Sequence, residues 1–289
     1  MTALEPIRTL IVTGQLSPEH DPNTNRLLRR MLESTGRFRV KITEEFRGAT
    51  AETLSHYDLV ILNYDGDFPY TGHPPVRLGA QAEKALLEAV RAGKGVVFHH
   101  SAVWTTAWPE EFLLMMGGYC APELGSRKNP ILDFEVKISQ NGNPITAGLA
   151  AAWNTVQDDL FAGVAWHPGA QVEVLATVFD DLAGYANMPP HIADMIPEGG
   201  PQAIKGVNED APVAWTNRFG DGRVFVISIG HGIDTIRRPG FVALYCRAAE
   251  WTATGAVTLA PPDLTGENRR RAWPYYSPFS IAELSSLLS

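Results

Sequence analysis

Four histidines follow short apolar segments of the chain, at positions where a strand ends and the next side chains become accessible. They are His20, His99, His100 and His231. The segments before them are residues 7–13, 95–98 and 224–229. Imidazoles titrate near neutral pH and bind transition metals, so histidines that share one site can transfer protons or hold an ion. Successive residues of a strand point to opposite faces, so at most one of His99 and His100 can face such a site.

These apolar segments belong to an alternation of strands and helices in the first part of the chain. Strands are predicted at residues 7–13, 38–42, 59–62 and 95–99, and helices near residues 22–35 and 82–92. Continuous apolar strands separated by helices are typical of a parallel sheet that is covered on both faces. A later helix is predicted to begin at Pro239 and to end at Gly255, because proline favours the first turn of a helix and glycine its end.

From about residue 130 the pattern changes to strands without long helices between them. They are predicted at residues 131–138, 172–178, 211–218 and 223–229. Gly220-Asp221-Gly222 separates the last two strands and is a strong hairpin signal. The sequence therefore predicts an α/β fold with a mainly parallel sheet, helices on both of its faces and an antiparallel hairpin.

Ligands of open α/β sheets bind beyond the carboxyl ends of the strands, so the residues after each strand are candidate site residues. Besides the histidines they include Tyr64, Asp65, Ser101, Trp104 and Trp108. Each has a structural alternative, since an aspartate beside a glycine commonly forms a turn and nearby tryptophans can serve packing alone. Histidines at three separate strand ends are harder to explain by packing, and they predict a functional site at this edge of the sheet.

Composition places the chain among ordinary globular proteins, with 45% hydrophobic and 19% charged residues. A formal net charge of −8 argues against nucleic acid as a partner, because no basic surface is available to follow the phosphates. The two cysteines give no disulfide framework and are expected to be reduced. The first residues lack the pattern of a signal peptide and no apolar run is long enough to span a bilayer, so we expect a cytoplasmic protein without membrane contact.

We expect one domain over residues 1–255, followed by a tail over residues 256–289. Within the domain, residues 180–210 are rich in Pro, Gly and Asn and too long for an idle connection, which predicts a lid or a subunit contact. The tail contains a capping box, Ser280 with Glu283, at the start of a short amphipathic helix. This helix is predicted to dock on the domain or on a second copy of the chain, and the second alternative would make a homo-oligomer.

Several segments of the chain, in their order and spacing, resemble the ThuA-like (trehalose utilisation) family. They are "IVTGQ" followed by His20, "LVILNYDGDF", "GKGVVFHHSA", "NPITAGL…DDLF", "PVAWTNRFGDGRVFVISIGHG" and "PGFVALYCRAAEW". The resemblance runs from about Leu10 to Trp251 and implies the flavodoxin-like fold of class I glutamine amidotransferases. Residues 180–210 and the tail lie outside it.

In glutaminases of this fold, the turn after the fourth strand presents a nucleophilic cysteine, and a histidine follows a later strand. Here the turn holds two histidines and Ser101, and both cysteines lie elsewhere, so thioester chemistry and glutaminase activity are not expected. His231 keeps the position of the later histidine. Ser101 lacks the glycine-flanked elbow of serine hydrolases, which argues against a Ser101–His231 nucleophile and base.

Two kinds of chemistry remain open for the histidines. In the first, they act as general acid and base by themselves. In the second, a divalent metal is bound by His20, one of the His99–His100 pair, His231 and a carboxylate. Imidazole and carboxylate ligands suit zinc or manganese.

ThuA-like proteins are associated with the catabolism of disaccharides and glycosides, beside dehydrogenases that form 3-keto sugars. The resemblance therefore implies a small-molecule partner, a keto-sugar or 3-keto-glycoside, whose carbonyl moves between neighbouring carbons through an enediol. The catalytic residues would be His100, His231 and Asp158. The residues that contact the sugar would be Tyr64, Asp65, Ser101, Trp104 and Trp108. Two alternatives stay open: a sugar-binding or regulatory module without turnover, and a hydrolase of glycosides or amides.

Overall fold

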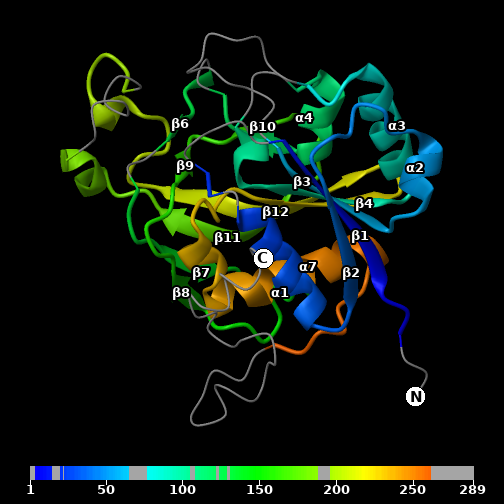
Figure 1. Cartoon of the computed structure of the whole chain (residues 1–289). Helices are drawn as coiled ribbons and strands as arrows, with labels where there is room; N and C mark the ends of the chain where they lie inside the picture. Colours follow the sequence, from blue (N-terminus) through cyan, green and yellow to red (C-terminus); the bar gives the residue numbers. More distant parts are fainter. Residues whose placement is uncertain are drawn as a thin grey trace.

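A computed structural model of the chain describes residues 4–14, 20–21, 23–64, 77–104, 108–121, 124–128, 131–187 and 196–261. Within these residues a nine-stranded sheet has the order β2-β1-β3-β4-β13-β12-β11-β7-β8. Figure 1 shows this sheet across the middle of the molecule, with helices on both sides of it. The predicted α/β fold with a large, partly parallel sheet is therefore confirmed.

Five neighbouring strands of the sheet are parallel. They are β1 (Ile7–Thr13), β2 (Phe38–Thr43), β3 (Leu59–Asn63), β4 (Gly95–His99) and β13 (Gly222–Ile227). Their order, β2-β1-β3-β4-β13, is the 2-1-3-4-5 order of one common type of doubly wound sheet. All five strands end at the same edge of the sheet, which we call the carboxyl edge, and begin at the opposite amino edge.

The other four strands extend the sheet in antiparallel pairing. They are β12 (Asp210–Phe219), β11 (Glu173–Phe179), β7 (Glu135–Ile138) and β8 (Ala152–Asn154). β12 and β13 form the predicted hairpin around Gly220-Asp221. The antiparallel part is larger than this hairpin, because β11, β7 and β8 continue it. Two short pairs lie outside the sheet, β5 (Gly118–Tyr119) with β10 (Ala165–Trp166) and β6 (Arg127–Lys128) with β9 (Phe161–Ala162).

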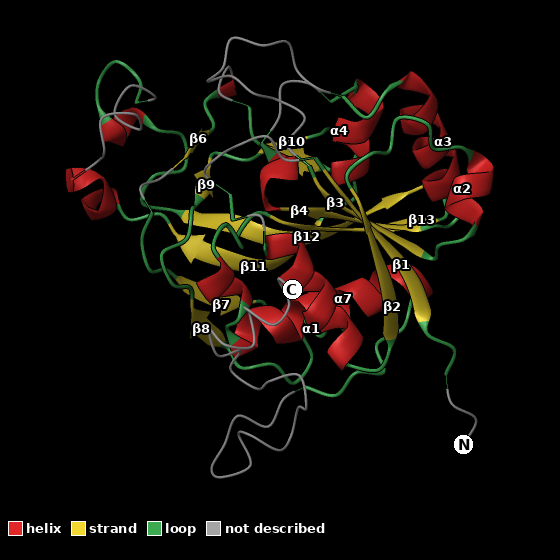
Figure 2. Cartoon of the chain, in the orientation of Figure 1, coloured by secondary structure: helices red, strands yellow, loops and turns green. Residues whose placement is uncertain are grey.

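Helices cover both faces of the sheet, as Figure 2 shows. On one face lie α1 (Thr24–Ser34) and α7 (Pro239–Thr254), and on the other lie α2 (Ala51–Ser55), α3 (Ala80–Arg91) and α4 (Glu110–Met116). The short helix α6 (Ile233–Ile236) precedes α7, and 3-10 turns occur at η1 (His100–Val103), η3 (Leu182–Asn187) and η4 (Pro201–Ala203). Successive side chains of β4 point to opposite faces of the sheet. Val97 therefore packs in the core with α1 and α7, whereas Val96 and Phe98 pack in the core with α3 and α4.

Helix α7 has the bounds that the sequence predicts. Pro239 stands in its first turn, and Gly255 caps its end in the left-handed conformation, with φ of +81°. The guanidinium of Arg223 donates to carbonyls of the last turn at 2.9–3.0 Å. Carbonyls at a helix end lack partners within the helix, so this arginine joins the end of α7 to β13.

Two predicted segments are described in part. Residues 180–187 and 196–210 of the predicted lid are described, and the buried carboxylate of Asp180 accepts from the hydroxyl of Tyr185 at 3.1 Å. Residues 188–195, and the predicted tail helix at residues 280–288, lie outside the described residues. The roles as lid, docking helix and oligomer contact therefore stay predictions.

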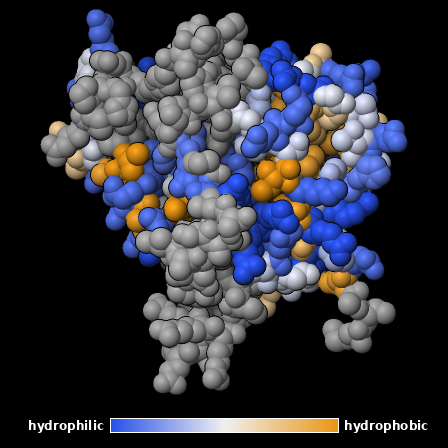
Figure 3. Space-filling model, viewed as in Figure 1, coloured by the Kyte–Doolittle hydropathy of each residue, from blue (hydrophilic) through white to orange (hydrophobic). Residues whose placement is uncertain are grey.

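The surface of the described residues carries no broad apolar face in the view of Figure 3, where apolar residues lie in small groups among hydrophilic ones. The large exposed apolar side chains are Leu4, Leu124, Ile131, Trp166 and Phe179. Such scattered residues are normal on globular proteins. Every described helix falls short of the length and apolar character that a bilayer crossing requires.

Candidate functional site

Three histidines from three separate segments meet at the carboxyl edge, and we call them the histidine cluster. The ring centroid of His20 lies 5.1 Å from that of His100 and 5.0 Å from that of His231. The centroids of His100 and His231 are 5.2 Å apart. One nitrogen from each of the three rings lies within 4.8 Å of the other two nitrogens. The structure therefore has the convergence that the strand order predicts.

His100 directly follows β4 in a strained backbone conformation, with φ of +45°. Residues other than glycine rarely adopt a positive φ, and such strain is concentrated at functional sites. The ring is buried, and its Nδ1 lies 2.7 Å from the carbonyl oxygen of Ser228. Because a carbonyl only accepts, Nδ1 carries the proton and Nε2 keeps a lone pair. Burial, reinforced by the neighbouring His20, holds the pKa of His100 well below its usual value, so the ring is neutral at pH 7.

Asp159 is the carboxylate in contact with the cluster. Its Oδ2 lies 3.1 Å from Nδ1 of His231 and 3.9 Å from Nε2 of His100. These two nitrogens are 3.3 Å apart. The Asp159 side chain is fully buried, whereas 11% of the His231 side chain is exposed. The carboxylate thus approaches the histidines from the interior, and His231 forms part of the boundary with solvent.

Asp158, the carboxylate predicted to act in catalysis, has a different place. Its Oδ1 accepts the backbone N–H groups of His231 at 2.8 Å and of Asp159 at 2.9 Å, and its Oδ2 accepts that of Gly230 at 2.9 Å. Burial raises the pKa of Asp158 to about 6, against the lowering effect of these bonds. The bonds hold the loop after β13, so Asp158 positions His231 and the geometry favours Asp159 for the role predicted for its neighbour. The acidic pair in "DDLF" is the sequence signal that could have indicated Asp159.

His99 is the member of the histidine pair that faces the core. Its ring makes edge contacts with Phe241 and Tyr245, at centroid distances of 6.3 Å and 5.6 Å. Burial lowers the pKa of His99 to about 3, so this ring is also neutral. The pair therefore divides as expected, with His100 in the site and His99 against α7.

An aromatic surface borders the cluster. Phe161 stacks on His100, with 5.1 Å between the centroids and 24° between the planes. The half-buried Trp104 lies against Phe161 at 5.3 Å. Trp104 is thus near enough to the cluster for the predicted contact with a sugar. Phe161 could not be recognised as a site residue from the sequence, because a phenylalanine in an apolar pair has the pattern of a core residue.

Two predicted contact residues, Trp108 and Ser101, are buried. Trp108 is buried, its Nε1 donates to the carbonyl of Ala102 at 3.0 Å, and its ring stacks on Phe112. These contacts match the packing alternative for this tryptophan. Ser101 lies in η1 with 4% of its surface exposed, which argues against a nucleophilic role.

Tyr64 lies at the end of β3 and lines a cavity of about 160 Å³ at the carboxyl edge. Thr13 and Gly14, at the end of β1, line the same cavity. A Cβ on Gly14 would lie 2.5 Å from the Tyr64 ring, so this position requires glycine for the tyrosine to pack. The described lining of this cavity includes no histidine of the cluster, so the sugar contact of Tyr64 stays a prediction, and Asp65 lies outside the described residues.

The two cysteines lie apart from the cluster. Cys120 and Cys246 are fully buried, and burial raises the pKa of both thiols, that of Cys120 to about 12. Thiols of this kind do not ionise at neutral pH and are poor nucleophiles. Both the position of the cysteines and the raised pKa of their thiols therefore disfavour glutaminase chemistry.

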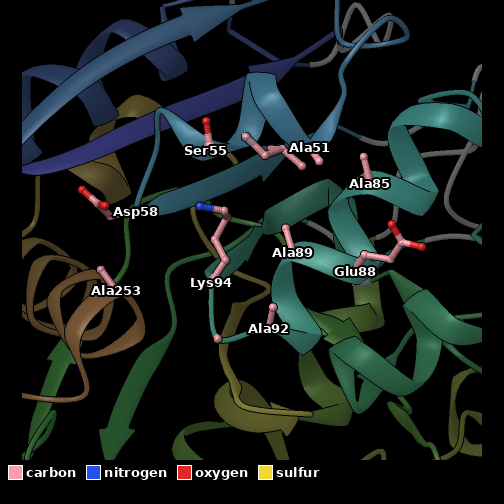
Figure 4. Close-up of a pocket in the computed structure, with 11 residues that line it drawn as sticks. Ala51, Ser55, Asp58, Ala85, Glu88, Ala89, Ala92, Lys94 and Ala253 are labelled. Carbon is pink, nitrogen blue, oxygen red and sulfur yellow. The ribbon is translucent and has the colours of Figure 1, made fainter.

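A second cavity, of about 520 Å³, lies at the amino edge (Figure 4). Alanines of α2, α3 and α7 form much of its lining, together with Asp58 before β3 and Lys94 before β4. Nζ of Lys94 donates to the carbonyl of Tyr57, and the carboxylate of Asp58 pairs with Arg8 at 2.6 Å. The charged groups of this cavity thus have ordinary structural partners.

Comparison with known families agrees with this fold. Residues 8–252 match the ThuA family, which is described as trehalose utilisation. Because the match spans most of the sequence, the chain belongs to the ThuA family.

Solved structures with the same fold include two ThuA-like proteins. That from Parabacteroides merdae ATCC 43184 is 24% identical with a TM-score of 0.69, over 90% of this chain and 94% of that one. That from Bacteroides uniformis ATCC 8492 is 19% identical with a TM-score of 0.62, over 89% and 96%. The beta-galactosidase from Rahnella sp. R3 is 15% identical with a TM-score of 0.50, over 86% of this chain and 31% of the enzyme. At these identities the likeness shows the fold alone. A search of curated proteins gave no match.

Proposed function

We propose that the chain is an enzyme of carbohydrate catabolism that isomerises a keto-sugar or 3-keto-glycoside through an enediol. Support for a sugar substrate comes from membership of the ThuA family, described as trehalose utilisation. The observation that carries the chemistry is the contact of two imidazoles, His100 and His231, with the buried carboxylate of Asp159 at the carboxyl edge.

Movement of a carbonyl to the neighbouring carbon needs a group that takes a proton from one carbon and returns it to the other. His231 is the partly exposed imidazole of the His100–His231 pair, and so a substrate can reach it. When His231 takes up the proton, the carboxylate of Asp159 at 3.1 Å stabilises the resulting imidazolium. The Asp158 carboxylate accepts the backbone N–H of His231 and so holds the His231 ring beside His100 and Asp159.

The same reaction places negative charge on the carbonyl oxygen, and this charge must also be stabilised. Nε2 of His100 carries a lone pair and Asp159 a negative charge, so neither can do this alone. The histidine cluster therefore supplies a proton acceptor but no group that stabilises the charge on the oxygen. The half-buried Trp104, packed on Phe161, offers an apolar face against which a sugar ring can stack.

The test is incubation of the protein with 3-keto-glucosides in deuterated water, followed by NMR. We expect deuterium to enter beside the carbonyl and an isomeric keto-sugar to form. The control is the same incubation with the His231→Asn protein, which keeps the size of the side chain but cannot exchange a proton. Substrate that binds but remains unlabelled and unchanged would contradict the proposal and support a sugar-binding module.

A further inference from the structure

We propose that His20, His100, His231 and Asp159 form a binding site for one divalent transition-metal ion. The site deepens the proposed function and rests on it for its role in the reaction, though not for its existence.

The distances between the ligand atoms are close to those of a tetrahedral site. A zinc ion with ligands at about 2.0–2.2 Å holds neighbouring ligand atoms about 3.3–3.6 Å apart. Nε2 of His100 and Nδ1 of His231 are 3.3 Å apart, and Oδ2 of Asp159 lies 3.1 Å from the second atom and 3.9 Å from the first. A nitrogen of His20, within 4.8 Å of a nitrogen on each of the other rings, supplies the fourth corner.

The orientation of the His100 ring is that of a metal ligand. Its Nδ1–H donates to the Ser228 carbonyl, so the lone pair of Nε2 is directed toward His231 and Asp159. Histidines that bind metals are usually held in this way by a carbonyl or carboxylate on the other nitrogen. The Asp158 carboxylate fixes the backbone of His231 and of Asp159 together, so two of the four ligands are held by one buried group.

A packing explanation accounts less well for this arrangement. Asp159 is fully buried, and a bound cation would offset the cost of burying its carboxylate. Strain also flanks the site, since both His100 and Gln157, the residue before Asp158, have φ of +45°. A cation shared by the three rings and the carboxylate provides a reason for both features.

Such an ion would supply what the proposed reaction lacks, a positive charge beside the carbonyl oxygen of the substrate. His231 would then hold the ion together with His20, His100 and Asp159, and the ion would supply Lewis acidity beside the substrate. Three imidazoles with one carboxylate suit zinc or manganese. The substrate class and the enediol are unchanged.

The experiment measures metal binding directly on the full-length protein after chelation and removal of the chelator. Zinc and, separately, manganese are titrated by calorimetry, and the bound ion is counted after equilibrium dialysis. We expect one ion per chain for at least one of the two metals. Absence of stoichiometric binding for both metals would overturn the proposal.

Variants locate the ion. We expect His20→Asn, His231→Asn and Asp159→Asn each to weaken metal binding by about tenfold to a hundredfold or more. The control is His56→Asn, the same change in an exposed imidazole at the end of α2, which should bind as the wild type does. Thermal melts of the metal-free proteins show which variants remain folded, and only the metal affinities of folded variants test the site. Unchanged affinity in folded His20→Asn and Asp159→Asn proteins would refute the site.

The two proposals fail in different ways. A protein that binds one ion at these residues but incorporates no deuterium into 3-keto-glucosides would refute the proposed function and leave the metal site standing. A chelated, metal-free protein that keeps its full rate of deuterium incorporation would refute the role of the ion and leave the function standing.

Discussion

Two aspartates at opposite edges of the sheet are held in opposite ways. Asp58 stands at the amino edge, where the guanidinium of Arg8 donates to its carboxylate at 2.6 Å and 3.0 Å and lowers its pKa. Asp158 is buried at the carboxyl edge, where burial raises its pKa to about 6 in spite of three backbone N–H bonds. The first environment favours the charged carboxylate, and the second makes its charge costly.

The difference extends from these two residues to the edges as a whole. At the amino edge, Lys94 and Asp58 have ordinary partners, and the cavity between them is lined with alanine. At the carboxyl edge, imidazoles face one another, Asp159 is fully buried, and His100 has a strained backbone. Features that are unfavourable for stability persist where function requires them. The strained and buried groups therefore indicate function at the carboxyl edge, although the cavity of about 520 Å³ lies at the amino edge.

The largest expected effect belongs to His231→Asn. This change keeps the size of the side chain and removes its ability to bind a proton or to serve as the same ligand. We predict a loss of about a hundredfold to ten-thousandfold in the rate of deuterium incorporation, with an unchanged fold. His56→Asn, in an exposed histidine near the amino edge, should leave the rate as it is. A His231→Asn protein that melts like the wild type and keeps its rate would remove His231 from the mechanism.

A smaller effect is expected for Asp159→Asn. The amide keeps the shape of the side chain but loses the negative charge 3.1 Å from Nδ1 of His231. Groups that support a catalytic or metal-bound histidine typically contribute about tenfold to a hundredfold in activity. Steady-state rates on the 3-keto-glucoside measure this loss. Full activity in the variant would show that the carboxylate serves folding alone.

Much of the fold could be predicted from local patterns. Strand β4 (Gly95–His99) and helix α7 (Pro239–Thr254) have nearly their predicted bounds, because apolar runs and the Pro and Gly signals are local properties of a sequence. Strand β8 (Ala152–Asn154) was not predicted, since its three residues are exposed or half-buried and carry no apolar pattern. Its place depends on pairing with β7, which is a non-local contact.

The candidate site divides in the same way. The order of strands and helices was sufficient to predict that His20, one of the His99–His100 pair and His231 meet at one edge. It could not separate Asp158 from Asp159, because both lie in one loop and the direction of each carboxylate depends on distant partners. Asp158 is turned toward Gly230 and the His231 backbone by hydrogen bonds across 72 and 73 positions of the chain, which leaves Asp159 beside the rings.

The comparison of the two aspartates also predicts opposite effects of pH on stability. The pKa of Asp158 is about 6 in the folded chain, above the ordinary 3.8. Between these values the folded state keeps a proton that the unfolded state has released, so this group makes the protein less stable as the pH rises. The effect on the free energy of unfolding amounts to about 3 kcal/mol once the pH exceeds the higher value.

Asp158→Asn removes this titration and isolates the effect. Between pH values of about 4 and 7, the stability of the variant should rise relative to that of the wild type. Urea unfolding of both proteins in metal-free form measures the difference without a cation that would alter the titration. Parallel pH profiles would mean that the three N–H bonds, and not burial, set the pKa of this carboxyl group.

The smallest expected effect, and one of opposite sign, belongs to Asp58→Asn. The pKa of Asp58 is lowered below 3.8 by Arg8, so its ionised form stabilises the fold above that value, and this stability is lost as the pH falls through the folded pKa. Because 38% of the side chain is exposed, water and salt screen the pair, and we expect a loss of less than about 1 kcal/mol at neutral pH. The same urea series should show the wild type gaining on this variant as the pH rises, with a smaller gain at high salt. A change as large as that at Asp158, or one of the same sign, would mean that the amino edge is under the same kind of strain as the carboxyl edge, and the assignment of function to one edge alone would no longer hold.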